Sequence, residues 1–227
     1  MRKTLLIAAL CVLAVTSHAQ TPIKAGTVQL GGAINYSQQT SDSPYAYSVG
    51  GGAYNTTTQH YTNKQLFLNP SAGYFVADNL AVGVSFARIL TTSSYTYDSS
   101  GYANPSEQRF KQTVLGAFVQ YYRMFTDHFG VTGTLNGGYT HSVENYTYGN
   151  PNTNTSNGFS AGLTPSVVFF PVPKFAVGAS AGSLSYSHST GKQEGINTIP
   201  GTSTYSSFAA AFGLSNLAFS GTYYFGR

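Results

Sequence analysis

The sequence has no tryptophan, a single cysteine and few charged residues. Charged side chains make up 8% of the 227 residues, whereas soluble proteins carry about 25%. The cysteine, Cys11, lies in an N-terminal leader, so the rest of the chain offers no disulfide, thiol nucleophile or cysteine metal ligand. No later stretch has ~18 consecutive apolar residues, which excludes membrane-spanning helices.

Basic residues are too few and too scattered to mark a nucleic-acid surface. Without Arg2 and Lys3 of the leader, nine basic side chains stand against seven acidic ones, and they form no run. We therefore expect no nucleic acid among the partners.

The leader itself has the three regions of a secretory signal peptide. Met1-Arg2-Lys3 is basic, Leu5 to Val15 is apolar, and Ser17-His18-Ala19 is a small-residue cleavage site. The apolar run is too short for a membrane anchor, and Leu10 before Cys11 does not suit a lipoprotein. The sequence predicts a Sec signal peptide over residues 1–19 and one domain over 20–227.

A repeated hairpin pattern is the main positive feature of the chain. Residues 69–85 and 164–180 each have an alternating apolar run, a tight polar turn and a second alternating run, and residues 126–131 repeat the second half. Such a pattern is typical of β-hairpins. We expect Asp78-Asn79 in the first copy to form its turn.

The alternation predicts eight strands. Four long polar loops are expected at 38–63, 91–109, 143–157 and 188–205, on the side opposite the short turns. Pro70 and Pro165 fall in mid-strand and suggest bulges or bends, because proline donates no ladder hydrogen bond. A bulge near Ser215-Asn216 would reconcile two registers in the last strand. The strands are expected near 26–37, 64–76, 80–90, 110–125, 129–142, Phe159 to Phe169, 175–187, and from Phe208 to the C-terminus.

One strand face is apolar and the other is small and polar. Aromatic residues form two belts, beside the turns and toward the loops, as at the two interfaces of a bilayer. The sequence predicts an all-β fold, an eight-stranded antiparallel up-and-down transmembrane β-barrel. A soluble sandwich or barrel with its apolar face inward is the alternative, but soluble surfaces carry more Lys and Glu. Val82, Val84, Leu163 and Val167 are expected to face lipid, and Gly83, Ser85, Gly162 and Ser166 the lumen.

The first hairpin also carries a family resemblance. Residues 70–83 read Pro-x-x-Gly-Tyr-Phe-Val-x-Asp-Asn-Leu-Ala-x-Gly. With Tyr121-Tyr122-Arg123 and the aromatic last strand, this run resembles small porin-like outer-membrane β-barrel proteins of the Bacteroidota type. The resemblance implies a place in the bacterial outer membrane and insertion by machinery that reads the C-terminal strand. Here Phe225 is followed by Gly226 and Arg227, a departure from the usual aromatic end.

Side chains with catalytic potential occur near the expected loops. His141-Ser142-Val143-Glu144, His188-Ser189 and Glu194 invite comparison with a lipid A-modifying hydrolase. Adjacent residues on a strand point to opposite faces, so His141 and Ser142 should diverge. His60 and His128 lack metal-ligand spacing. We expect no catalytic, cofactor-binding or metal-binding residues.

Three functions remain open at this point. The first is a structural or surface-interaction barrel without catalysis, whose long loops could hold an extracellular ligand. The second is a narrow channel or transport route for small or hydrophobic molecules, and the third is the hydrolase. Outer-membrane lipid and lipopolysaccharide are the expected surroundings. Arg88, Glu107, Arg109, Lys111 and Glu144 are expected at the loop side, either as a charged rim or plug or as solvated loop bases.

Overall fold

The structure is a computed structural model that describes residues 22–98, 106–147, 152–195, 201–213 and 217–227. The predicted signal peptide and the predicted bulge near Ser215-Asn216 lie outside these residues. The described chain is built from β-strands, and it contains no helix long and apolar enough to cross a membrane.

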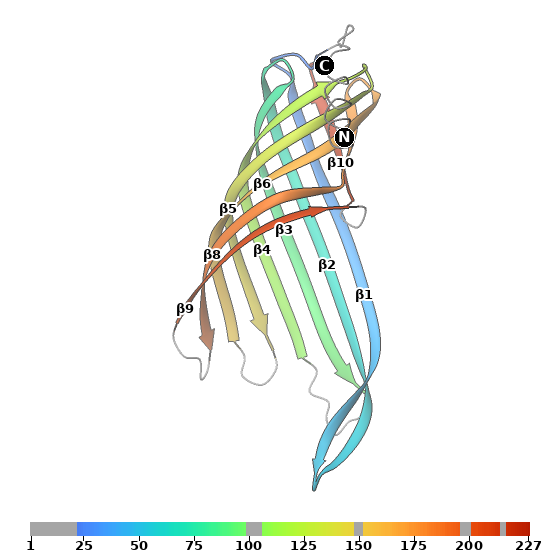
Figure 1. The fold of residues 1–227 in the computed structure, drawn as a ribbon, viewed down its shortest axis with the longest axis vertical. Helices are drawn as coiled ribbons and strands as arrows, with labels where there is room; N and C mark the ends of the chain where they lie inside the picture. The colour runs from blue at the N-terminus through green and yellow to red at the C-terminus, as the bar shows by residue number, and fades with distance from the viewer. Residues whose placement is uncertain (1–21, 99–105, 148–151, 196–200, 214–216) are drawn as a thin grey trace, which may run out of the picture.

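Ten antiparallel strands form one sheet (Figure 1). Short connections join β2 to β3, β4 to β5 and β6 to β7 at one end, here called the turn end. The opposite end, which carries the β1–β2 tip, is called the loop end. The strands are β1 (Val28–Gly50), β2 (Ala53–Ala77), β3 (Leu80–Tyr97), β4 (Ser106–Met124), β5 (Phe129–Tyr146), β6 (Asn152–Val172), β7 (Phe175–Ser180), β8 (Gly182–Gly195), β9 (Thr202–Phe212) and β10 (Ala218–Phe225).

At the turn end the sheet closes into the predicted eight-stranded barrel. The closed ring runs β1-β2-β3-β4-β5-β6-β7-β10, and β10 pairs back with β1. The predicted seventh strand consists of β7 and β8. The predicted eighth consists of β9 and β10.

The division of the seventh strand has a visible backbone cause. β6 pairs with β8 up to Leu163↔Leu184 and with β7 from Val167↔Ala179, so the register changes by one residue between them. Gly182, at this step, has a φ of 135°, which residues with a side chain rarely adopt. Its Cβ would also lie 2.0 Å from the Ala211 carbonyl oxygen.

The prediction of four long loops at the other end is largely wrong. Residues 38–63 form a paired hairpin, in which Ser41 lies opposite Tyr61 and Gly50 opposite Ala53. Gly50, Gly51 and Gly52 all have positive φ and make its turn. The other three expected loops are also mostly strand, since β3 reaches Tyr97, β5 reaches Tyr146 and β8 reaches Gly195. These segments are rich in Thr and Tyr, which favour strands, and they form strands although both faces of the sheet are exposed to solvent there.

The two mid-strand prolines differ: Pro70 marks no bulge, whereas Pro165 lies where one of the two ladders of β6 changes register. Pro70 lies opposite Gly32, and the β2–β3 register is the same on either side of it. Pro165 lies opposite Gly133 in an unbroken β5–β6 register. On its other side, β6 changes register by one residue between Leu163 and Val167, so the predicted irregularity occurs at Pro165 in the pairing with β8 and β7.

The predicted strand faces are confirmed. The outward side chains of Val84, Leu163 and Val167 are exposed, and Val84 has 59% of its surface exposed. Inward positions are small or buried. Phe118 fills the lumen beside Gly73 and Gly83, where a Cβ would lie 3.0 Å and 2.5 Å from its ring. The apolar face is therefore outside, which contradicts the alternative of a soluble barrel with an apolar interior.

Candidate functional site

The lumen is filled at the turn end by a small buried core. Phe75 and Phe170 are fully buried, as are Tyr122 and Tyr224, whose rings lie 5.4 Å from Phe75 and 5.2 Å from Phe170 respectively. Residues 22–27 fold across this end and insert Ile23 into the core. Packed rings of this kind exclude solutes.

Backbone and side-chain hydrogen bonds fix this cap. The Ile23 amide donates to Asn79 Oδ1 at 2.9 Å, and the Asn79 amide donates to the Ile23 carbonyl. Asn79 can do both because it adopts a left-handed conformation, with φ 63°, in the predicted turn. The Gly26 amide donates to the Phe75 carbonyl.

A polar layer lies on the luminal side of this core. The Tyr122 hydroxyl is 2.9 Å from the Gln29 and Gln120 side-chain oxygens and from the Tyr224 hydroxyl, and Gln29 Nε2 donates to Gln120. The cavity that Tyr122 and Tyr224 line with Thr132 and Ser220 measures about 40 Å³. A space of this size suits water rather than a solute.

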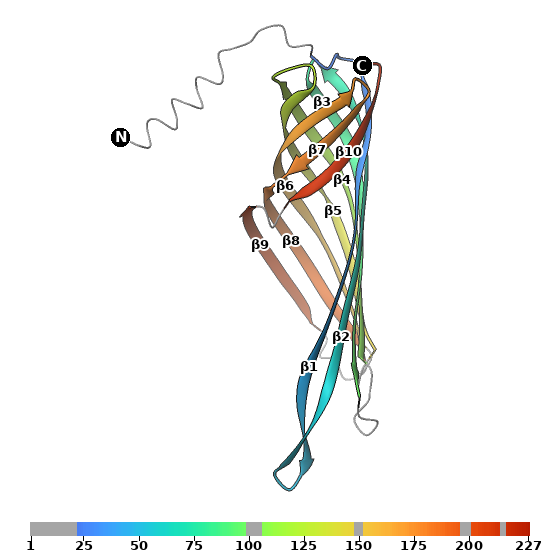
Figure 2. The ribbon, with the colours of Figure 1, turned by 90° about the vertical axis from the view of Figure 1, so that its right-hand side faces the viewer.

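The wall is open between β1 and β9 toward the loop end, and we call this interval the seam. β10 pairs with β1 only from Val28 to Gly32. From Ala33 onward, no strand of the described residues pairs with that edge of β1, and β9 lies apart from it (Figure 2). Apolar side chains flank the seam, with Ile34 75% and Phe208 71% exposed.

The inner face of the loop-end sheet, which continues the luminal face by alternation, carries tyrosines and amides. The Tyr61 and Tyr95 rings lie 4.8 Å apart, and Gln59 Nε2 donates to the Tyr97 hydroxyl. Across β5, β6, β8 and β9 the same face has a polar groove of about 340 Å³, lined among others by Glu144 and Tyr205. These groups could hydrogen-bond and stack with a polar ligand.

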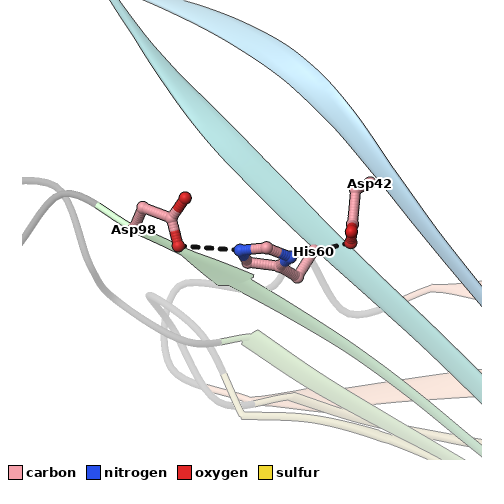
Figure 3. Close-up of polar contacts among 3 residues, drawn as sticks. All are labelled: Asp42, His60 and Asp98. Atoms are coloured by element: carbon pink, nitrogen blue, oxygen red, sulfur yellow. Dashed lines mark hydrogen bonds and ion pairs between the residues drawn. The ribbon is translucent and has the colours of Figure 1, made fainter.

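Three side chains from neighbouring strands meet on the outer face of this sheet (Figure 3). His60 on β2 lies between Asp42 on β1 and Asp98, which directly follows β3. Its Nδ1 is 2.7 Å from Asp42 Oδ1 and its Nε2 is 2.8 Å from Asp98 Oδ1. All three side chains are substantially exposed.

Protonation decides how this group holds together. A neutral imidazole has one donor nitrogen, whereas the imidazolium donates from both. The hydrogen bond to Asp98, followed by that to Asp42, raises the pKa of His60, while partial desolvation opposes the rise. The hydrogen bond from His60 in turn lowers the pKa of Asp98. The charged form therefore ties the β1–β2 hairpin to the end of β3.

The side chains considered for hydrolysis are not assembled into a catalytic arrangement. His141 lies on the outer face and its Nδ1 is 2.7 Å from Asn157 Oδ1, whereas Glu144 lies on the inner face with Gln108 and Asn154. His188 Nδ1 is 2.8 Å from Ser206 Oγ. Within the described ranges, no group of three or more His, Cys, Asp or Glu side chains has an arrangement that could hold a metal ion.

The expected charged loop residues divide between the two faces. Arg88, Glu107, Arg109 and Lys111 lie on the outer face, and Glu144 on the inner one. Arg88 donates to Thr113 Oγ1, and Arg109 pairs with Glu107. They therefore form no plug of the barrel mouth.

The sequence does not reveal the Asp42–His60–Asp98 group, because its composition predicts a loop over residues 38–63. The Gly50-Gly51-Gly52 run was the available signal. A hairpin turning there places Asp42 directly opposite His60.

Comparisons with known proteins concern the fold. Neither a family model nor a curated protein matches the sequence. The crystal structure of the outer membrane protein OprG from Pseudomonas aeruginosa is similar with a TM-score of 0.47 and 15% identity, covering 92% of this chain and 100% of that one. A major outer membrane protein from Thermus thermophilus has a TM-score of 0.41 and 14% identity, covering 87% and 99%. At these values the likeness carries no argument about role, and the Bacteroidota assignment stays a prediction.

Proposed function

We propose that this protein is a β-barrel of the bacterial outer membrane whose loop-end sheet projects from the cell surface in a structural or surface-interaction role, without catalysis. The observation that carries the proposal is strand length. β1 has 23 residues and β2 has 25, whereas about 9–11 residues cross a membrane as a tilted strand. More than half of this hairpin thus extends beyond any bilayer.

The outward side chains support the membrane location. Around the barrel they include Val, Leu and Phe with high exposure, such as Leu115 and Phe169. In water such a surface would promote aggregation, whereas lipid solvates it. Export by Sec and reading of the C-terminal strand by the insertion machinery are proposals that follow from this location.

The projecting part has the chemistry of an adaptable recognition surface. Its rows of Thr, Ser, Asn and Tyr offer hydroxyl donors and acceptors together with flat rings. Cross-strand pairing gives this surface a fixed shape, which reduces the entropy cost of binding. An extracellular ligand would meet the tyrosines and the groove beside Tyr205.

Cell fractionation tests the location. The mature chain is expected in the outer-membrane fraction, with a gel mobility that changes on boiling because the barrel resists detergent. Recovery as a soluble periplasmic protein would refute the proposal.

The seam favours a second function, a lateral route for small hydrophobic molecules. A lumen closed at the turn end leaves the loop-end mouth and the seam as openings, and the seam is flanked by the apolar Ile34 and Phe208. This route needs the seam to stay open in a membrane.

Disulfide formation in two double-cysteine variants, treated with the same oxidant, tests whether the seam is open. A Leu30→Cys/Tyr223→Cys pair should form a disulfide because these residues are paired. A Thr40→Cys/Phe212→Cys pair should not, and equal yields would argue against the route.

A further inference from the structure

Four of the nine basic residues after the leader gather on the outer face of three adjacent strands. They are Lys64 on β2, Arg88 on β3, and Arg109 and Lys111 on β4, and we call them the basic patch. Arg88 is partly covered, and the other three are exposed. Glu107, paired with Arg109, is the one carboxylate on this part of the outer face within the described residues.

Strand register sets the extent of the patch. Lys64 and Arg109 both flank Thr92, so their backbones lie two strand spacings apart, about 10 Å. Arg88 lies opposite Thr113, two residues from Lys111, a diagonal of about 7–8 Å. Arg88 lies four residues from Thr92 on β3, so the patch extends about 13 Å along the strands.

The lower edge of the patch, at Arg88, is where the apolar wall ends. The outward row just below Arg88 is aromatic and aliphatic, running across β3 to β6 as Phe86, Leu115, Tyr139 and Phe159. Aromatic rows mark the interface between hydrocarbon and headgroups. The patch therefore begins at headgroup level on the loop side.

An apolar groove lies directly below the aromatic row. It has a volume of about 680 Å³ and runs over β3 to β6 between Val84, Val119, Leu135 and Ala161. Ala117 and Gly137, which lie side by side in the register, leave space for it because they carry little or no side chain. From Arg88 to Val84 the strand covers about 13 Å, a distance that an acyl chain spans easily.

We propose that the basic patch and this groove together form a binding site for a phosphorylated glycolipid of the outer leaflet, with the phosphates on the patch and an acyl chain in the groove. The inference rests on the proposed membrane location. Arg and Lys are the usual partners of phosphate oxygens. A soluble acidic polymer would satisfy the patch but leave the groove empty, so the amphiphile accounts for both features.

The test uses the full mature chain refolded into phosphatidylcholine vesicles that contain a minor fraction of lipid A. Lipid retained on the extracted protein is counted by native mass spectrometry. The variant Lys64→Gln/Arg109→Gln/Lys111→Gln removes three charges from the patch. The matched control Lys24→Gln/Lys174→Gln/Lys192→Gln removes three charges elsewhere, and Ala117→Phe fills the groove.

Wild type and control are expected to retain lipid A in preference to phosphatidylcholine and to dephosphorylated lipid A. The patch variant should bind it more weakly by about fivefold per charge, and Ala117→Phe should reduce retention without affecting insertion. Equal retention by the patch variant, or indifference to the phosphates, would overturn the site. Failure of the wild type to insert into vesicles would instead refute the membrane location.

Discussion

The turn end and the loop end of this molecule use the same strands in different ways. At the turn end eight strands close, and the lumen is filled by Phe75, Phe170, Tyr122 and Tyr224. At the loop end the sheet is open at the seam, and polar side chains cover both of its faces.

The contrast shows which environment each part requires. Backbone groups in hydrocarbon must be paired, which demands a closed ring. The closing β10–β1 pairing is short, from Gly32↔Gly221 to Val28↔Phe225, so most of the β1 edge must reach water or a lipid interface. Stability should therefore reside at the turn end and binding at the loop end.

The largest difference should come from truncating one ring in each region. Phe75→Ala should cost about 3–5 kcal/mol because it empties a buried site. Tyr61→Ala should cost about 0.5–1.5 kcal/mol, the usual contribution of an aromatic pair. Folding titrations into vesicles measure both, and similar costs would remove the distinction between the two ends.

An arginine placed at two positions along β3 tests where the membrane ends on the outer face. Val84→Arg faces lipid and should cost ~2–4 kcal/mol. Ser94→Arg, also outward but opposite Glu107 in the projecting part, should change stability by less than about 0.5 kcal/mol. The same titrations apply, and a large cost at Ser94 would place the membrane higher on the sheet than we infer.

The smallest effect concerns pH. The pKa of His60 is raised in the folded protein, so its contribution is present below the ordinary histidine pKa and is lost as pH rises through the raised value. Hydrogen exchange, corrected for intrinsic rates, should show residues 40–62 losing protection over that range while the turn end does not. His60→Gln should abolish the pH dependence; an unchanged profile in this variant would exclude the group as its cause.

Sequence reasoning succeeded where one sheet face is apolar. The alternation through Val82, Val84 and Phe86 fixed both strand and face, and Asp78-Asn79 fixed the turn. It failed over residues 38–63, because both faces of the sheet are exposed to solvent there and the side chains do not alternate between apolar and polar. Only the glycines signalled a hairpin.

Features that depend on the pairing of strands far apart in the chain could not be predicted from the sequence. Asp42 meets His60 only once the register is known, and Asp98 joins them from a third strand. The seam arises because β10 pairs with β1 over a short stretch while β9 does not. Nothing local in Ala33 or Thr202 signals that their strand edges stay apart.

The most direct test of the account is labelling of intact cells with a membrane-impermeant thiol reagent. Single cysteines are introduced at Thr57 in the projecting hairpin, at Thr153 near the start of β6, and at Asn79 in a turn-end connection. We predict labelling at positions 57 and 153 without cell lysis, and at position 79 only after lysis. Labelling of position 79 on intact cells, with the other two protected, would contradict the assignment of the loop end to the cell surface.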